Sequence, residues 1–177
     1  MDSKETGIGR FARAASFAAQ KHSTQRRKDA EASPYINHPL ALATLLANED
    51  VDVLCAAVLH DTIEDTATTA DELRAHFGDT VASIVMEATD DKTLPPDVRK
   101  QLQTEHAPHA SPQAKLVKIA DKIYNLRDLL TSPPPEWPAE RRRNYFDWSM
   151  QVVAGLRGVN PSFDAAFDEI VARRTEL

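Results

Sequence analysis

The stretch V-D-V-L-C-A-A-V-L-H-D-T-I-E-D, residues 51–65, decides both the fold and the site of this chain. It begins as a nearly unbroken apolar run, which predicts a buried helix, and it ends in His60, Asp61, Glu64 and Asp65. Residues four apart share one face of a helix, so His60 is aligned with Glu64 and Asp61 with Asp65. The sequence therefore predicts three carboxylates and an imidazole gathered at the end of a core helix.

Such a crowded group of acidic side chains has a physical cost. Neighbouring carboxylates repel one another and resist the loss of water, so the cluster needs a compensating charge, and a divalent cation would supply it. The alternative is that residues 51–59 are ordinary core and residues 60–65 a solvated helix end, because charged helix termini are common. The rest of the chain has to decide between these interpretations.

Length and charge limit the classes of protein to consider. The 177 residues suit a single domain, residues 1–177, with a substantial core. Lys and Arg number 21 and Asp and Glu 27, which gives a formal net charge of −6. A general nucleic-acid binder usually has a basic surplus that neutralises phosphates, so we expect no nucleic-acid partner. An anionic ligand would have to meet a local basic pocket.

The single cysteine and the hydropathy pattern indicate the compartment. Cys55 lies in the middle of the apolar run, which excludes a disulfide framework and indicates a core position. The longest apolar stretch, Val53–Leu59, is too short to span a membrane, and the N-terminal segment lacks the pattern of a secretion signal. The simplest interpretation is a soluble cytoplasmic protein without a membrane partner. The sequence carries no indication of its oligomeric state.

Helical spacing of apolar residues recurs along the chain, and no alternating strand pattern of useful length occurs. We expect an all-α domain of about eight to ten helices. Thr69 and Glu72 have the capping-box spacing, Gly78 is suited to end that helix, and Asp79 to cap the next one. Two long helices are predicted over residues 111–130 and 141–156, separated by a proline-rich connector.

Four side chains are candidate metal ligands. His38 stands at a predicted helix entrance, His60 and Asp61 are adjacent, and Asp121 lies on the predicted helix over residues 111–130. Two imidazoles and two carboxylates suit Mn²⁺, Fe²⁺ or Zn²⁺ better than Ca²⁺, which prefers oxygen ligands. A lone His38 is also typical of a helix cap or a surface, and an adjacent His-Asp pair is common by chance. Spacing alone leaves both interpretations open.

Two groups of cations accompany these candidates. Lys118, Asp121, Lys122 and Asn125 share one helical face, so that carboxylate is flanked by positive charge. Residues 25–29 form a short basic cluster, which indicates either a phosphate contact or simply a solvated face.

Five linked motifs resemble, in order and spacing, the HD-domain hydrolases of the Rel/Spo family. The motifs are Arg26-Arg27-Lys28-Asp29, Tyr35-Ile36-Asn37-His38-Pro39, His60-Asp61-Thr62-Ile63-Glu64-Asp65-Thr66, Asp91-Lys92-Thr93-Leu94-Pro95, and residues 115–126 with Lys118, Asp121, Lys122 and Asn125. The chain is most similar to the stand-alone metazoan-type small alarmone hydrolases, and the resemblance covers residues 20–160. Within the metal motif, Ile63 stands where a valine is usual.

The resemblance implies a helical HD-domain bundle and an enzyme that hydrolyses guanosine 3′,5′-bis(diphosphate) to GDP and pyrophosphate. It assigns four metal ligands to one Mn²⁺, with Zn²⁺ or Fe²⁺ as alternatives, two carboxylates to the attacking water, and five side chains to the substrate. The metal ligands are His38, His60, Asp61 and Asp121. The carboxylates for the water are Glu64 and Asp65, and the substrate residues are Arg27, Lys28, Lys100, Asn125 and Tyr145.

The chemistry of these residues agrees with those roles. A divalent ion acts as a Lewis acid on the 3′-diphosphate and lowers the pKa of a water, while Glu64 or Asp65 orients that water and takes its proton. The cations offset phosphate charge in an otherwise acidic protein.

Two alternatives remain open at this point. The first is an HD phosphatase that acts on another phosphorylated nucleotide, such as NADPH. The second is a non-catalytic module that binds a nucleotide, although the presence of every ligand together with Glu64 and Asp65 argues against it.

Overall fold

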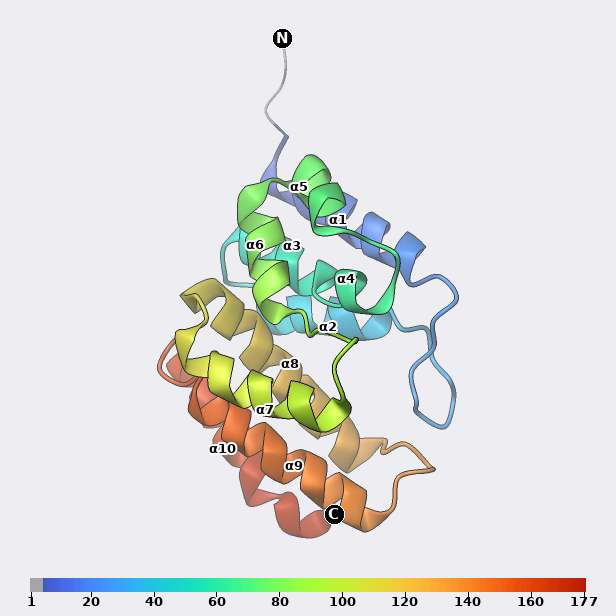
Figure 1. Cartoon of the computed structure of the whole chain (residues 1–177), viewed down its shortest axis with the longest axis vertical. Coiled ribbons are helices and arrows are strands. Elements are labelled where there is room, and N and C mark those ends of the chain that lie inside the picture. The colour runs from blue at the N-terminus through green and yellow to red at the C-terminus, as the bar shows by residue number, and fades with distance from the viewer. Residues whose placement is uncertain (1–4) are drawn as a thin grey trace. The chain divides into compact units, whose positions relative to one another are not determined.

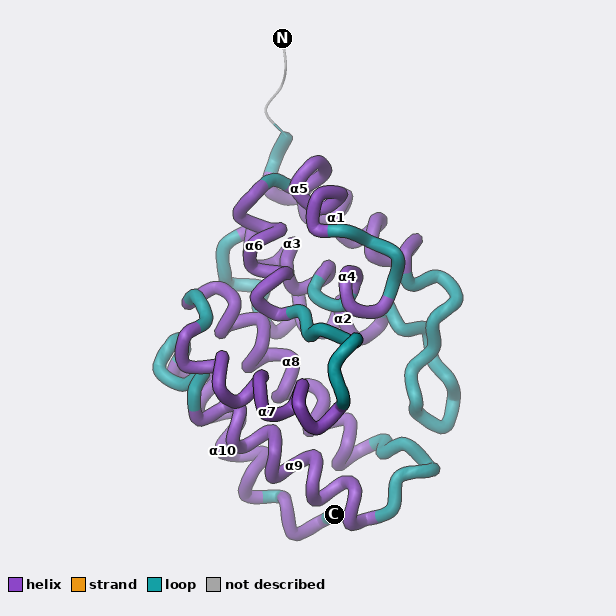
Figure 2. The backbone as a smooth tube through the Cα atoms, viewed as in Figure 1, coloured by secondary structure: helices purple, strands orange, loops and turns teal. Residues whose placement is uncertain are grey.

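The computed structural model describes residues 5–177, and within that range all regular structure is helical (Figure 2). The expected all-α fold is confirmed. The described residues divide into two compact units. Unit 1 holds the residues up to Gln25 together with Pro34–Thr89, and unit 2 holds Arg26–Ser33 together with Asp90–Leu177. That residues 1–177 act as one domain stays a prediction.

Unit 1 contains six α-helices (Figure 1). Their bounds are α1 Gly7–Lys21, α2 Asn37–Leu45, α3 Val51–Leu59, α4 Thr62–Asp65, α5 Ala70–Phe77 and α6 Asp79–Ala88. Helix α3 is the centre of this unit because it packs against α1, α2 and α6. Its last five residues, Cys55–Leu59, are fully buried, so the apolar run of the sequence is core, as expected. Burial also raises the pKa of the Cys55 thiol to about 11.

The helix boundaries in this unit follow local chemistry. The Thr69 hydroxyl accepts a hydrogen bond from the backbone N–H of Glu72 at 3.1 Å, so the predicted cap begins α5. Gly78 ends α5 with a positive φ of 88°. The prediction that Asp79 caps α6 is wrong, because Asp79 is already the first helical residue and Gly78 occupies the cap position.

The predicted continuous helix over residues 51–65 is interrupted. Helix α3 ends at Leu59, and α4 begins only at Thr62. The hydroxyl of Thr62 donates to the carbonyl of Leu59 at 2.6 Å, and Nδ1 of His60 hydrogen bonds to the carbonyl of Ala57 at 2.9 Å. These side chains take carbonyls that would otherwise serve the backbone ladder, which accounts for the break. His60 and Asp61 therefore lie at a junction between two helices.

Unit 2 contains four α-helices and two short 3₁₀ segments. Their bounds are α7 Pro96–His106, η1 Ala107–His109, α8 Pro112–Thr131, α9 Ala139–Ala154, α10 Pro161–Ala172 and η2 Arg174–Glu176. Helix α8 packs against α9 and α10, and α7 packs against α9. The side chain of Ser111 caps α8, whose apolar face is buried through Ile119, Ile123 and Leu126. Helix α9 begins and ends two residues earlier than expected.

No helix in residues 5–177 is long and apolar enough to cross a membrane.

Gly155 makes a close backbone approach in unit 2. A Cβ atom at this position would lie 2.8 Å from Cδ of Pro108 and 2.9 Å from Cβ of Ala107. Both atoms belong to the turn that follows α7, so the end of α9 can pack there only without a side chain.

We predict that Gly155→Ala lowers the free energy of unfolding by about 1 to 3 kcal/mol, the usual cost of overpacking. Gly7→Ala is the control, because its Cβ would meet Val51 at 3.6 Å, an ordinary contact. Urea unfolding of both variants measures the difference. Equal stability of the Gly155 variant and the parent protein would mean that residues 107–108 move aside freely.

Candidate active site

Two buried histidines meet where α2 packs against α3 in unit 1. His38 lies in the first turn of α2 and is 2% exposed, and His60 follows α3 and is 6% exposed. Their ring centroids are 5.3 Å apart, and each ring offers a nitrogen within 4.8 Å of the other. Because burial disfavours a charged imidazole, two adjacent buried rings are suited to act as neutral metal ligands.

The carboxylate of Asp61 adjoins both imidazoles. Its Oδ2 lies 2.8 Å from Nε2 of His60 and 3.9 Å from Nε2 of His38. The carbonyl of Ala57 can only accept, so its hydrogen bond with Nδ1 of His60 places the proton on Nδ1 and leaves a lone pair on Nε2. A lone pair and a carboxylate oxygen at 2.8 Å repel each other unless a proton or a cation joins them. These donors therefore fit a divalent cation.

Tyr35 holds the same carboxylate oxygen. Its hydroxyl donates to Oδ2 of Asp61, and its ring lies 5.9 Å from the ring of His38 and 4.9 Å from that of His22. Tyr35 therefore contacts both the imidazole and the carboxylate sides of the group. Residues in this position orient metal ligands in many proteins.

The two predicted water-handling carboxylates lie on α4. Both Glu64 and Asp65 are half-buried. The backbone N–H of Asp65 donates to the carbonyl of Asp61 at 2.8 Å, and its Oδ2 accepts from Nε2 of Gln25 at 2.7 Å. Unit 1 thus brings His38, His60, Asp61 and Asp65 into one connected group.

Asp121, the fourth predicted ligand, lies in the middle of α8 in unit 2. Nδ2 of Asn125 donates to its Oδ1 at 2.6 Å, and Nζ of Lys122 lies 3.4 Å from its Oδ2. The helical face predicted from the sequence is therefore present, and Asn125 is a support of Asp121.

Lys122 is an unusual member of this face because it is 6% exposed. Burial by itself would lower the pKa of its ammonium, but the phenol of Tyr145 and the carboxylates of Asp121 and Asp90 outweigh burial, and the pKa is raised. Its Nζ also lies 4.4 Å from the ring centroid of Trp148. Lys122 is accordingly a buried, charged residue.

The two predicted substrate residues of the basic cluster, Arg27 and Lys28, differ in their contacts. Arg27 forms an ion pair with Asp128 of α8, and its guanidinium lies 5.8 Å from the ring centroid of Tyr124. Lys28 is exposed. Arg27 is thus tied to unit 2 by its own contacts, and the substrate role of both residues stays a prediction.

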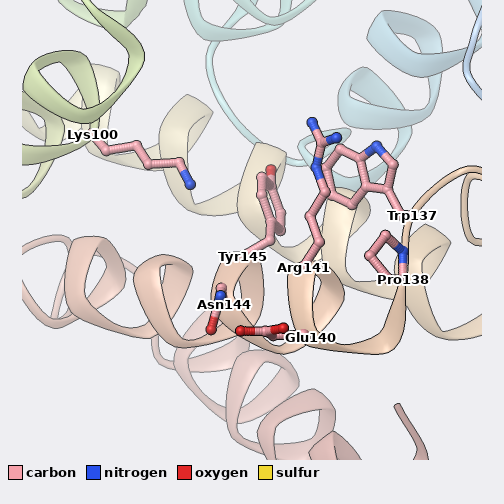
Figure 3. Close-up of a pocket in the computed structure, with 7 residues that line it drawn as sticks. All are labelled: Lys100, Trp137, Pro138, Glu140, Arg141, Asn144 and Tyr145. Carbon is pink, nitrogen blue, oxygen red and sulfur yellow. The ribbon is translucent and has the colours of Figure 1, made fainter.

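A cavity of about 420 Å³ lies between α7 and the start of α9 in unit 2. It is lined by Lys100, Trp137, Pro138, Glu140, Arg141, Asn144 and Tyr145. Figure 3 shows the Lys100 side chain extending toward Tyr145, with Arg141 beside Trp137. The guanidinium of Arg141 lies 4.3 Å from the ring centroid of Trp137, and the rings of Trp137 and Tyr145 are 5.6 Å apart. Cations and aromatic rings together suit a phosphorylated molecule with a planar group.

Comparison with known proteins identifies the family. A model of the HD domain matches residues 14–157 of this chain. The chain belongs to the HD-domain family. Members of this family that are hydrolases bind divalent metals, in agreement with the donors around Asp61.

Several similar proteins match this chain over nearly their whole length. The guanosine-3′,5′-bis(diphosphate) 3′-pyrophosphohydrolase MESH1 of Xenopus tropicalis is 56% identical over 161 residues, which cover 89% of this chain and 90% of that protein. Its human counterpart is 54% identical over 165 residues, covering 91% and 92%. A solved structure of a metazoan SpoT ortholog that hydrolyses ppGpp has a TM-score of 0.91 at 44% identity, covering 95% and 97%.

Sequence reasoning missed residues in each of the two units. Tyr35 stands three residues before His38 in the motif Tyr35-Ile36-Asn37-His38-Pro39. A hydroxyl so close to a candidate ligand in the sequence could have indicated its role. Trp137 belongs to the proline-rich connector and Arg141 to the start of α9, where neither a helical period nor a metal motif indicates a site. They were recognisable only once the fold placed them around one cavity.

We predict that Tyr35→Phe weakens the binding of Mn²⁺ by about 10- to 100-fold, the usual effect of removing a hydrogen bond to a metal-ligating group. The ring and its contacts with His22 and His38 remain, so the fold should be unchanged. Titration of metal-stripped protein measures the affinity. Unchanged affinity would show that Asp61 is oriented without this hydroxyl.

Proposed function

We propose that this chain hydrolyses guanosine 3′,5′-bis(diphosphate) to GDP and pyrophosphate with the help of Mn²⁺. The observation that carries the proposal is the meeting of Asp61 Oδ2 with the Nε2 atoms of His60 and His38, at 2.8 and 3.9 Å. The similar proteins named as 3′-pyrophosphohydrolases of this nucleotide support the choice of substrate.

The proposal assigns the ion to His38, His60 and Asp61 and keeps Asp121 as the fourth ligand, as the family resemblance implies. Mixed imidazole and carboxylate ligands suit Mn²⁺, and they suit Zn²⁺ or Fe²⁺ as well. The bound ion would supply Lewis-acid stabilisation of the phosphate and lower the pKa of a nearby water. Asn125 holds Asp121 in place through its 2.6 Å hydrogen bond.

Glu64 and Asp65 supply the acid–base chemistry in this proposal. One of these carboxylates orients the water and accepts its proton as the water oxygen bonds to the ester phosphorus of the 3′-diphosphate. The bond from that phosphorus to the ribose 3′-oxygen then breaks. Pyrophosphate leaves, and the 3′-oxygen takes a proton to form the hydroxyl of GDP.

The cavity in unit 2 supports a role in binding the nucleotide. Lys100 and Arg141 bring positive charge to it, and Tyr145 brings a hydroxyl beside the buried cation Lys122. A volume of about 420 Å³ lies within the range of small-molecule sites. We infer that these residues bind phosphate groups of the substrate, together with Arg27 and Lys28.

A turnover assay on two substrates tests the function. Protein loaded with Mn²⁺ is incubated with guanosine 3′,5′-bis(diphosphate) or with NADPH, and the released pyrophosphate or phosphate is measured. We expect pyrophosphate release that chelation abolishes and added Mn²⁺ restores. Full activity of metal-free protein would contradict the mechanism. Turnover of NADPH without turnover of guanosine 3′,5′-bis(diphosphate) would show that NADPH is the substrate.

We predict that Arg141→Met raises KM for the nucleotide about tenfold, equivalent to roughly 1.4 kcal/mol of binding, without loss of metal. Arg143→Met is the matched control, because Arg143 is also an exposed cation of α9 but does not line the cavity. Steady-state kinetics and metal analysis of both variants provide the comparison. Identical KM values for the two variants would exclude the cavity from substrate binding.

A further inference from the structure

We propose that Gln25 is a positioning residue for Asp65, and that His22 fixes the orientation of its side-chain amide. The inference rests on the proposed function, in which Glu64 or Asp65 orients the attacking water, and it takes Asp65 as the carboxylate that does so. All of the residues involved lie in unit 1.

The central contact joins two segments that are 40 residues apart in the chain. Nε2 of Gln25 donates to Oδ2 of Asp65 at 2.7 Å. A carboxylate that acts on a water must present one oxygen in a fixed direction, since small misplacements of reacting groups cost large factors in rate. The amide engages Oδ2 and so restricts rotation of the Asp65 carboxylate about its Cβ–Cγ bond.

His22 determines which end of the amide faces Asp65. It is 2% exposed, and its Nδ1 lies 2.6 Å from Oε1 of Gln25. An ionised carboxylate only accepts, so the amide nitrogen must face Asp65 and the amide oxygen must face His22, whose Nδ1 then carries the proton. Within residues 5–177, Nε2 of His22 has no hydrogen-bond partner, which agrees with a ring that donates through Nδ1. His22 and Gln25 therefore form a chain of donors directed at Asp65.

The backbone of Gln25 is held as firmly as its side chain. Its N–H donates to the carbonyl of His22 at 3.0 Å, and its carbonyl accepts from the N–H of Tyr35 at 3.1 Å. The ring of His22 also lies 4.9 Å from that of Tyr35, whose hydroxyl donates to Asp61. His22 thus supports the metal-ligating carboxylate through Tyr35 and the water-handling carboxylate through Gln25.

A simpler alternative is that Gln25 only ties the segment after α1 to α4 and stabilises the fold. The two alternatives predict different kinetics. A positioning residue acts through Asp65, so its removal should matter only while Asp65 is ionisable. A purely structural tie should affect every variant by the same factor.

The test is a double-mutant cycle with Gln25→Met and Asp65→Asn, in which methionine keeps the length of the side chain but neither donates nor accepts as an amide does. We expect Gln25→Met to lower kcat for guanosine 3′,5′-bis(diphosphate) about 10- to 100-fold, with KM and Mn²⁺ content unchanged. In the Asp65→Asn background, the same change should alter the single-turnover rate less than about twofold. Gln20→Met on the exposed side of α1 is the control and should equal the parent protein.

The outcomes separate this inference from the proposed function. A parent protein that fails to hydrolyse the nucleotide would overturn both. If the parent protein is active and the Asp65→Asn variant has full activity, then Asp65 takes no part in the reaction and Gln25 has no positioning role. The proposed hydrolase activity would be unaffected by that result. Equal factors for Gln25→Met in both backgrounds, or no effect in the parent, would overturn the positioning role alone.

His22 is tested with a pair of substitutions at saturating Mn²⁺. Asparagine places a donor near the position of the imidazole Nδ1, whereas leucine has none. We expect His22→Asn to retain most of the parent kcat and His22→Leu to lose a factor similar to that of Gln25→Met. Equal kcat values for the two variants would overturn the role of His22.

Discussion

The approach of His60 Nε2 to the Asp61 carboxylate, at 2.8 Å, is the constraint on which the site depends. It exists because α3 ends at Leu59, where the imidazole of His60 bonds back to Ala57. An uninterrupted helix would direct adjacent side chains about 100° apart around its axis. The junction brings them together instead, and the core packing of α3 holds the junction in place.

Unit 2 contains a second group of charges, in which a half-buried carboxylate faces a buried ammonium. Asp121 receives a hydrogen bond from Asn125 and faces the ammonium of Lys122, which is itself buried against Trp148. Loss of the Asp121 carboxylate would remove one of the negative groups that face the buried ammonium of Lys122.

The sequence predicted the helices where periodicity and capping agree, as at α8 with Ser111 and at α5 with Thr69. It could not predict the break after Leu59, because the side chains that compete for backbone carbonyls also occur inside helices. The chemistry of His60 and Asp61 was visible from residue types and from the family resemblance. The contacts made by Gln25 were not, since no local pattern records a hydrogen bond across 40 residues.

Cys55 has a consequence for how the molecule responds to oxidants and labels. Its side chain is fully buried and its pKa is raised to about 11, so at neutral pH only about one molecule in ten thousand carries the reactive thiolate. Peroxide and alkylating reagents should therefore react very slowly with Cys55 in the folded protein. The single native thiol can consequently stay in place when a second cysteine is introduced on the surface to carry a fluorophore or a spin label.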